Sequence, residues 1–423
     1  MRILIWTHGT RGDVQPYLAL GYALHNAGHE PVVAGPRCYS GHAEQHGLNY
    51  AGLDDRWNRL TDDPEIRHAL ESNYAGVKGK KLAGTVIRRT RAYMATVLRE
   101  IADVADEGMY DAVVHHTLVP GQHLGEYLDV PTFPVALQPV WIPTSAFPSP
   151  LGPQSLPPAF NRMTYSSSQF LVRAMFPKIG AWRAGRLGLP RYRRRMHNPF
   201  VRPDGAATTT LQAFSNGVLP ADPAYPDTVH TTGFWYLPAP GDWQPAPALA
   251  AFLSNGERPV YIGFGSMTGK DPAQTAATVS KALAITGMRA IVVTGEGGLR
   301  EEAFSGDVFV AGEIPHDWLF PLTRVIVHHG GGGTTGAALR AGIPQVICPF
   351  TGDQPFWARQ MHRIGVSPPP VSQADITAEG LARAITHAVT SSTIAAKAAQ
   401  FAQTANSEHG VTQAVQIIEQ AMT

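Results

Sequence analysis

The hydrophobic pattern of the first third of the chain alternates between short β-branched runs and longer amphipathic stretches. The predicted elements are strands at residues 2–6, 30–34, 112–115 and near 132–135, with helices from the loop at 8–13 to about residue 26, near 64–74 and at 82–106. Alternation of strand and helix in this way is typical of a doubly wound parallel sheet.

A second series of the same kind starts at Pro259. Its predicted strands lie near 260–264, 289–294, 308–310, 324–328 and 345–348, and its last helices near 355–364, 378–390, 391–405 and 411–422. Residues 216–258, rich in Pro, Gly and Asp, form the predicted linker. We therefore predict an α/β protein with two Rossmann-like domains, at 1–215 and 259–400, whose parallel sheets face each other across a cleft. A final helix at 401–423 could pack back on the N-terminal domain.

One strand of the second series runs into a glycine-rich loop. The strand at 324–328 ends at His329, and residues 330–333 are all glycine. Thr334 or Thr335 can cap the helix that follows. A helix N-terminus offers unpaired N–H groups and partial positive charge, and glycine lets a ligand approach the backbone. The loop therefore suits a phosphate.

Two polar residues follow the next predicted strand. Asp353 and Gln354 come after residues 345–348, so they emerge at the same carboxyl edge of the sheet as His329. The glycine loop matches neither the Walker A nor the GxGxxG pattern. A phosphate site beside a carboxylate and an amide suits a nucleotide joined to a polyhydroxylated group.

The first strand is followed by the segment HGTRGD at 8–13, which holds two candidates for a general base. Asp13 is the preferred base, although an aspartate at a helix start is also a common cap. His8 is the alternative base. If it is not catalytic, it is a packed or hydrogen-bonded histidine at a strand end.

A proline-rich stretch at 138–158 breaks the α/β alternation. Apolar side chains exposed on such a loop are unfavourable unless they bury against protein, a lipid-like ligand or a membrane surface. The alternative is a surface loop whose apolar residues pack on their own domain. If the loop is functional, a hydrophobic ligand would meet Trp141, Ile142, Phe147 and Leu151.

Composition adds few constraints. A formal net charge of +1 gives no argument for nucleic acid, and two distant cysteines fit a reducing cytosol. The chain lacks a run of about 18 apolar residues and its start lacks the features of a signal peptide, so we expect a cytoplasmic protein. Two basic clusters are interpreted as solvated surface or, alternatively, as contact with an anionic membrane surface or acceptor. They comprise Lys78, Lys80, Lys81, Arg88, Arg89 and Arg91, and Arg191, Arg193, Arg194 and Arg195.

Seven motifs along the chain resemble those of family-1 inverting glycosyltransferases with the two-domain GT-B fold. The resemblance is strongest to sterol glucosyltransferases and bacterial natural-product glycosyltransferases, of the glycopeptide and macrolide types. The motifs are GTRGDVQPY (9–17), FPSP (147–150), TTGFWYLP (231–238), VYIGFGSM (260–267), IPHDWLFP (314–321), HHGGGGTTGAALRAGIPQ (328–345) and PFTGDQPFWARQ (349–360).

The resemblance implies a role for each matching residue. Donor diphosphate binding falls to His329, Gly331, Gly332, Gly333, Thr334 and Ser266, with Thr10, Arg11 and Gly12 bordering the phosphates. Asp353 and Gln354 would hold sugar hydroxyls, and the neighbourhood of Ile314 would receive the base. Asp13 stands where related motifs carry the catalytic histidine. It would take the acceptor's proton in a single displacement at the anomeric carbon. The resemblance also implies that the hydrophobic ligand of the proline-rich loop is the acceptor of a transferase.

Two departures from the plant signature bear on the donor. Trp318 is displaced from the start of the nucleotide motif, and Ala337 replaces the glutamate that grips the ribose. The donor therefore stays open between UDP and dTDP sugars, with the sterol-type block favouring UDP-glucose. We expect no metal, because no cluster has metal-ligand spacing and the acidic pairs at 54–55 and 62–63 lie in an ordinary polar loop. We expect no cofactor, because the nucleotide sugar would be a substrate.

Three other functions are compatible with parts of the pattern. A sugar-nucleotide epimerase shares the architecture but needs no apolar acceptor pocket. A non-catalytic partner of a glycosyltransferase is disfavoured by the intact Asp13, His329, Asp353 and Gln354. A dinucleotide-dependent oxidoreductase is disfavoured by the absence of its fingerprint.

Overall fold

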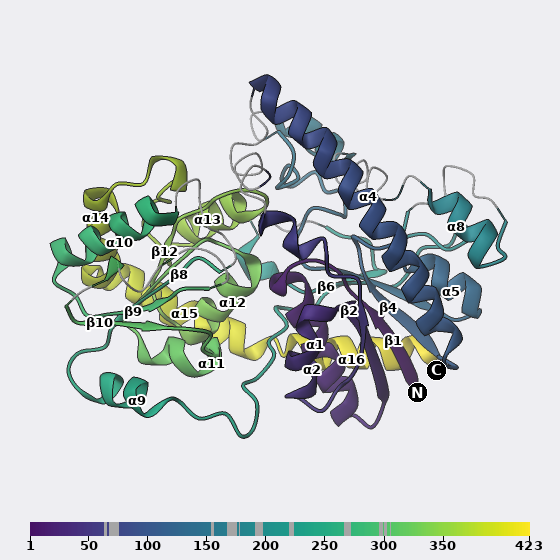
Figure 1. Cartoon of the computed structure of the whole chain (residues 1–423), viewed down its shortest axis with the longest axis horizontal. Helices are drawn as coiled ribbons and strands as arrows, with labels where there is room; N and C mark the ends of the chain where they lie inside the picture. Colours follow the sequence, from purple (N-terminus) through teal and green to yellow (C-terminus); the bar gives the residue numbers. More distant parts are fainter. Residues whose placement is uncertain are drawn as a thin grey trace. The chain divides into compact units, whose positions relative to one another are not determined.

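The chain folds into two compact units, each built on a parallel sheet. The computed structural model describes residues 1–62, 66, 76–153, 156–166, 176, 178–190, 198–219, 224–265, 272–295, 299, 303–304 and 306–423. The first unit comprises residues 1–237 and 409–423, and the second comprises residues 238–408. The predicted parallel α/β architecture is confirmed in both units (Figure 1).

The sheet of the first unit has the strand order β3-β2-β1-β4-β5-β6-β7 among the described residues. Its strands are β1 (Arg2–Trp6), β2 (Glu30–Pro36), β3 (Asn49–Leu53), β4 (Ala112–His116), β5 (Thr132–Ala136), β6 (Thr210–Gln212) and β7 (Val229–Thr231). Its helices are α1 (Arg11–Asn26), α2 (Ser40–Glu44), α4 (Gly76–Asp106), α5 (Gln122–Leu128), α6 (Asn161–Thr164), α8 (Ile179–Arg186) and α16 (Gly410–Met422). β1 pairs in parallel with both β2 and β4, so the loops after β1 and β4 leave the same edge of the sheet.

The sheet of the second unit has the order β10-β9-β8-β11-β12 among the described residues. Its strands are β8 (Val260–Gly263), β9 (Ala290–Val293), β10 (Val308–Ala311), β11 (Val325–His328) and β12 (Gln345–Ile347). Its helices are α9 (Pro247–Ser254), α10 (Pro272–Thr286), α11 (His316–Leu319), α12 (Gly332–Ala341), α13 (Gln354–Arg363), α14 (Ala378–Thr390) and α15 (Ser392–Ser407). β11 lies between β8 and β12, so the glycine loop leaves the carboxyl edge of the sheet between the loops that follow β8 and β12.

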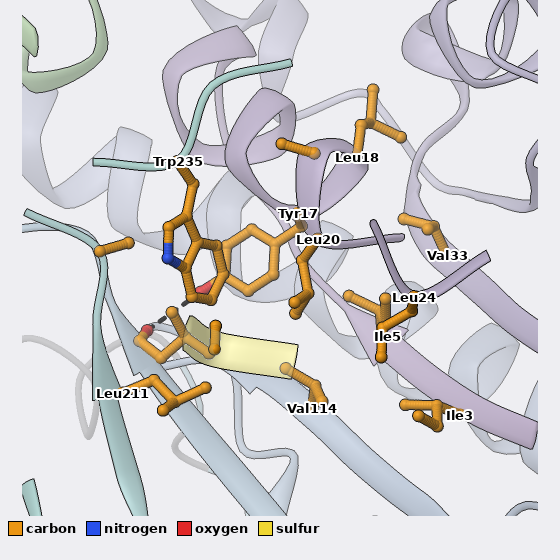
Figure 2. Packing of buried hydrophobic residues seen from close by; sticks show 14 of the residues in the cluster. Ile3, Ile5, Tyr17, Leu18, Leu20, Leu24, Val33, Val114, Leu211 and Trp235 are labelled. Carbon is orange, nitrogen blue, oxygen red and sulfur yellow. Dashed lines mark hydrogen bonds between the residues drawn. The ribbon is translucent and has the colours of Figure 1, made fainter. Parts of the chain in front are cut away.

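The C-terminal helix completes the core of the first unit. Ala414, Val415 and Ile418 of α16 are buried in the same cluster as the apolar residues of β1 and α1. Figure 2 shows this cluster around Tyr17 and Trp235, where the Tyr17 hydroxyl donates to the Val135 carbonyl at 3.0 Å. The stretch 216–258, predicted as the linker, contributes β7 to the first sheet and α9 to the second unit.

Three strands of the first sheet were not predicted from the hydrophobic pattern. β3 has intermediate or exposed residues at most positions, and β6 and β7 are three residues long and include polar side chains. β3 and β7 are the edge strands of this sheet, and β6 lies between β5 and β7. Strands this short or this exposed carry little periodic signal, because pairing with neighbouring strands rather than their own side-chain pattern holds them in place. The helical prediction at 64–74 falls almost wholly outside the described residues.

Candidate functional site

The first group of candidate residues lies at the junction of β1 and α1. Asp13 is in the first turn of α1, and its Oδ2 accepts hydrogen bonds from the backbone N–H and the hydroxyl of Thr10, at 2.9 and 3.0 Å. Gly9 has φ +135°, and a Cβ there would lie 2.4 Å from Asp13 Oδ2. The loop therefore needs glycine to curl around this carboxylate, and Asp13 does have the structural role of a helix-start residue.

The other carboxylate oxygen of Asp13 faces the end of β4. Asp13 Oδ1 lies 4.0 Å from Nε2 of the fully buried His116, while the Asp13 side chain is 17% exposed. Thr7 fixes the backbone here, because its hydroxyl donates to the Asp13 carbonyl at 2.7 Å. One oxygen thus serves the helix, and the carboxylate keeps solvent access that a reacting group needs.

His8, the alternative base, is far less accessible. It is 4% exposed, and burial lowers its pKa to about 4, although Asp54 and Asp55 partly oppose that shift. Its ring lies against Trp57, with the ring centroids 5.9 Å apart. The imidazole is therefore neutral near pH 7 and enclosed, which fits the interpretation of His8 as a packed histidine at a strand end. The carboxylate of Asp13 is the more accessible of the two candidate bases.

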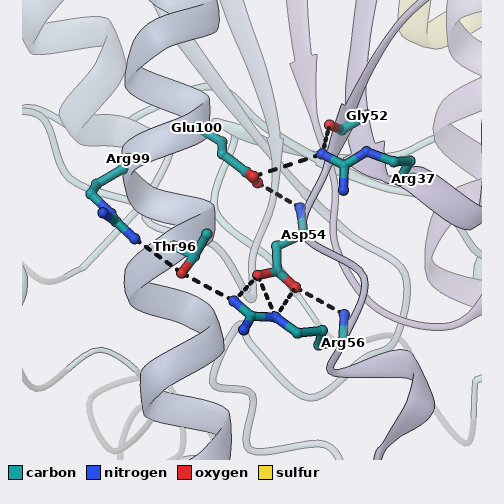
Figure 3. Close-up of polar contacts among 7 residues, drawn as sticks. All are labelled: Arg37, Gly52, Asp54, Arg56, Thr96, Arg99 and Glu100. Carbon is teal, nitrogen blue, oxygen red and sulfur yellow. Dashed lines mark hydrogen bonds and ion pairs between the residues drawn. The ribbon is translucent and has the colours of Figure 1, made fainter.

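The segment after β3 holds the loop that carries His8 and Gly9. Asn58 donates from Nδ2 to the Gly9 carbonyl at 2.7 Å. The start of this segment is anchored on α4, because the Asp54 N–H donates to Glu100 Oε2 at 2.6 Å and Arg56 pairs with the Asp54 carboxylate (Figure 3). Asp54 thus helps to hold the segment that supports the His8–Gly9 loop, a structural role that its sequence context did not reveal.

The second group of candidate residues surrounds the start of α12. The helix begins at Gly332, and its N-cap is Gly331 without a side-chain cap, so the expectation that Thr334 or Thr335 caps it is wrong. The physical reason is that both threonines lie inside the first helical turns. Gly331 cannot readily be replaced, because a Cβ there would lie 2.5 Å from Nε2 of His329.

Two buried polar atoms near this helix start have no hydrogen-bond partner in the structure. They are Nδ1 of His329 and Oγ1 of Thr335. Burial lowers the pKa of His329 to about 4, so the ring is neutral near pH 7. By contrast, the neighbouring His328 is satisfied, with Gln345 Oε1 at 2.8 Å from its Nε2 and the Gly330 N–H donating to its Nδ1 at 3.1 Å. Thr335 was not among the predicted site residues.

Asp353 and Gln354 lie at the start of α13, in the same unit as His329. Asp353 Oδ2 accepts from the Trp357 indole N–H at 2.9 Å, and burial raises the pKa of its carboxyl. Gln354 Oε1 accepts the backbone N–H groups of Phe350 and Thr351, at 2.9 and 3.3 Å. These bonds fix the direction of both side chains before any ligand binds.

The other residues discussed for donor binding differ in burial, and one lies outside the described residues. Ile314 is 6% exposed and packs in the core that α11 and α12 share. Trp318 packs against Trp243, with centroids 4.9 Å apart, and Ala337 is half-buried on α12. Ser266 lies outside the described residues, as do Arg191, Arg193, Arg194 and Arg195 of one basic cluster.

The proline-rich loop differs from its expected form. Trp141, Ile142 and Phe147 are buried within the first unit, and Leu151, at 40%, is exposed. The Tyr165 hydroxyl donates to the Phe147 carbonyl at 3.2 Å and so helps to hold the loop against the unit. The premise of exposed apolar side chains therefore holds for Leu151 alone among the four.

Neither a metal cluster nor a spanning helix was found in the part of the chain that the structure describes. No group of three or more His, Cys, Asp or Glu residues there could hold a metal ion. No helix there has the length and apolar character that crossing a membrane requires.

Comparisons with known proteins identify close relatives. Residues 255–421 match the family model described as erythromycin biosynthesis protein CIII-like, C-terminal domain. O-mycaminosyltylonolide 6-deoxyallosyltransferase of Streptomyces fradiae is 34% identical and is matched over 99% of this chain and 97% of the relative. Sterol 3-beta-glucosyltransferase of Pichia angusta is 30% identical over 100% of this chain, which spans 33% of that longer relative.

Solved structures agree on the fold. The calicheamicin glycosyltransferase CalG4 has a TM-score of 0.70 at 16% identity and covers 99% of this chain and 97% of its own. The glycosyltransferase VinC, solved in complex with dTDP, has a TM-score of 0.65 at 19% identity and covers 100% and 99%. The chain therefore belongs to the family-1 glycosyltransferases with a CIII-like C-terminal domain, and its two α/β units form the GT-B fold.

Proposed function

We propose that this glycosyltransferase moves a hexose from a nucleoside diphosphate sugar to a hydroxyl of a hydrophobic natural product, with inversion at the anomeric carbon. The observation that carries the proposal is the start of α12. His329 Nδ1 and Thr335 Oγ1 are buried there without partners, beside a helix N-terminus without a side-chain cap. Buried polar atoms rarely stay unpaired, so a ligand with anionic oxygens accounts for them.

The donor's other contacts follow from the same unit. We propose that Gly331, Gly332, Gly333 and Thr334 line the diphosphate with His329, and that Asp353 and Gln354 hold sugar hydroxyls. Ser266, Ile314, Thr10, Arg11 and Gly12 remain proposed donor contacts on the resemblance alone. UDP-glucose is the preferred donor, and a dTDP sugar is the alternative, consistent with the dTDP complex of VinC.

Asp13 is proposed as the general base. Its Oδ2 is held by Thr10, and its partly exposed carboxylate can take the proton of an acceptor hydroxyl as that oxygen attacks the anomeric carbon. Negative charge then grows on the departing diphosphate, where the α12 N-terminus and His329 would stabilise it. Because the N–H groups of the helix start supply positive potential and the neutral His329 can supply a hydrogen bond, we propose that the reaction needs neither a metal nor a cofactor, and that EDTA leaves the rate unchanged.

The acceptor is proposed to be a sterol, a polyketide or a similar bulky alcohol. Two relatives bear names that specify a tylonolide derivative and a sterol. Leu151 is exposed and available for direct contact, whereas the buried Trp141, Ile142 and Phe147 would shape the loop behind it. Contact of the exposed Arg88 and Arg89 with an anionic membrane surface remains a further proposal.

Nucleotide binding tests the donor site directly. UDP or dTDP should raise the melting temperature of the wild-type protein, because a ligand selective for the native state stabilises it. His329→Ala should lose most of that shift. His387→Ala, which changes an exposed histidine on α14 of the same unit, should keep it. If neither nucleotide shifts the melting temperature at millimolar concentration, the proposed donor site is wrong.

A further inference from the structure

His116 is a buried histidine at the carboxyl end of β4 that no sequence motif singled out. Its Nδ1 accepts the backbone N–H of Leu118 at 3.1 Å. A neutral imidazole carries one proton, so this bond assigns that proton to Nε2. The same Nε2 is buried, has no hydrogen-bond partner in the structure and lies 4.0 Å from Asp13 Oδ1.

The surroundings fix both the charge and the direction of the ring. Burial lowers the pKa of His116 to about 3, and the neighbouring His115 and His8 act in the same direction. Tyr17 packs its ring edge-on against His116, with centroids 5.6 Å apart, and is itself anchored through its hydroxyl to Val135. The ring is therefore neutral near pH 7, packed against Tyr17 and hydrogen-bonded to the Leu118 N–H.

We propose that His116 is a positioning residue for Asp13, donating its Nε2–H to Oδ1 and so setting the direction of the carboxylate that receives the acceptor's proton. This inference rests on the proposed role of Asp13 as base. A shift of about 1 Å closes the gap to a hydrogen bond, and catalytic hydrogen bonds are often long before substrate binds.

A neutral donor suits a general base better than a cation does. A lysine, arginine or protonated histidine at the same place would favour the charged carboxylate strongly and weaken it as a base, whereas a neutral N–H orients it at smaller cost. His116 does not act as a proton relay in this arrangement. Its Nε2 already carries a proton, and its Nδ1 is occupied by the Leu118 N–H.

Two polar substitutions separate the contribution of the Nε2–H group from that of the rest of the His116 side chain. In His116→Asn the amide oxygen can still accept the Leu118 N–H, but no donor reaches Asp13. In His116→Gln the terminal amide takes roughly the place of Nε2 and can donate. We expect His116→Asn to lower kcat by about 10- to 100-fold, which is the scale of a misplaced reacting group. The KM for the nucleotide sugar should stay within a few-fold of the wild-type value. His116→Gln should restore most of that loss.

The pH profile distinguishes positioning from simple packing. A hydrogen bond to the carboxylate favours its charged form, so losing the donor raises the pKa of Asp13. The titratable groups that face His116 are Asp13 and Tyr17 on α1, His8 after β1 and His115 on β4. The acid limb of kcat should therefore move to higher pH in His116→Asn and return in His116→Gln. His25→Gln, a control at an exposed histidine on α1 outside this group, should leave the limb in place.

A double mutant shows whether His116 acts through Asp13. His116→Asn should cause no further loss in an Asp13→Asn background, because the group that it positions is already gone. Full additivity, equal kcat for His116→Asn and His116→Gln, or an unmoved acid limb would overturn the inference. If instead Asp13→Asn alone keeps nearly full activity, the proposed base itself fails, and that outcome is distinct from the others.

Discussion

Asp13 has a structural role at the start of α1 beside its proposed role as general base, and the sequence presents these two roles as alternatives. Its Oδ2 closes the first turn of α1 on Thr10, and its Oδ1 points towards His116. A carboxylate with one oxygen fixed by local hydrogen bonds has less freedom to lose when a substrate binds, which favours catalysis. The structural and the catalytic interpretations of Asp13 are therefore compatible.

Asp13→Asn tests the base at the residue scale. The amide keeps the size of the side chain and an oxygen for the Thr10 donors, but it cannot take a proton. We expect kcat to fall by about 10²–10⁴-fold, while UDP or dTDP affinity stays the same. Single-turnover rates and nucleotide titration check the two halves. Activity within a few-fold of the wild type would move the role to His8 or elsewhere.

At the scale of elements, the strand–loop–helix units that carry the candidate residues could be predicted well. β1 with α1 and β11 with α12 have strong apolar runs and glycine-rich junctions, so their patterns are unambiguous. β6 and β7 could not be predicted, because three-residue strands depend on their neighbours. His116 was missed for a related reason: its link to Asp13 arises from the pairing of β1 with β4, which single-chain patterns do not encode.

The glycine before α12 offers a test of that element. Gly331→Ala adds a Cβ that would lie 2.5 Å from His329 Nε2, so the imidazole must move. We expect nucleotide affinity to fall by about tenfold or more, since a displaced His329 imidazole loses its proposed hydrogen bond to the diphosphate. Gly241→Ala, at an exposed position of the same unit with nothing within 4 Å of an added Cβ, is the matched control. Equal affinities in calorimetric titration would contradict this account of the loop.

The return of α16 to the first unit predicts a stability effect far from the donor loop in sequence. Ile418 is fully buried in the core of the first unit, so Ile418→Ala should lower its free energy of unfolding by about 2–5 kcal/mol. Gln416→Ala, on the exposed side of the same helix, should change it by about 0.5 kcal/mol or less. Denaturant unfolding followed by tryptophan fluorescence measures both. Similar values for the two variants would show that α16 is dispensable for the core.

At the scale of the whole molecule, buried histidines make stability depend on pH. Burial lowers the pKa of His8, His115 and His329 to about 4 and that of His116 and His328 to about 3. The unfolded chain, with histidine pKa values near 6.5, then binds more protons than the native state below that pH. Stability should therefore fall as pH falls from about 6.5 towards 4.

Thermal unfolding across that window tests the prediction. The melting temperature should drop steadily from pH 7 to pH 5, and His25→Ala, at an exposed histidine, should leave the slope unchanged. A melting temperature that stays constant or rises on acidification would mean that these imidazoles are hydrated or charged in the native state.

The stereochemistry of the product is the sharpest test of an inverting transfer with Asp13 as its base. In the proposed single displacement, an acceptor oxygen, deprotonated by Asp13, attacks the anomeric carbon of an α-linked donor. UDP-glucose or dTDP-glucose incubated with a sterol or a macrolide-type alcohol should therefore give a β-glycoside, identified from the anomeric proton coupling in the NMR spectrum. Asp13→Asn should give little of the same product. An α-glycoside, or consumption of the donor without transfer to any hydrophobic alcohol, would contradict the account.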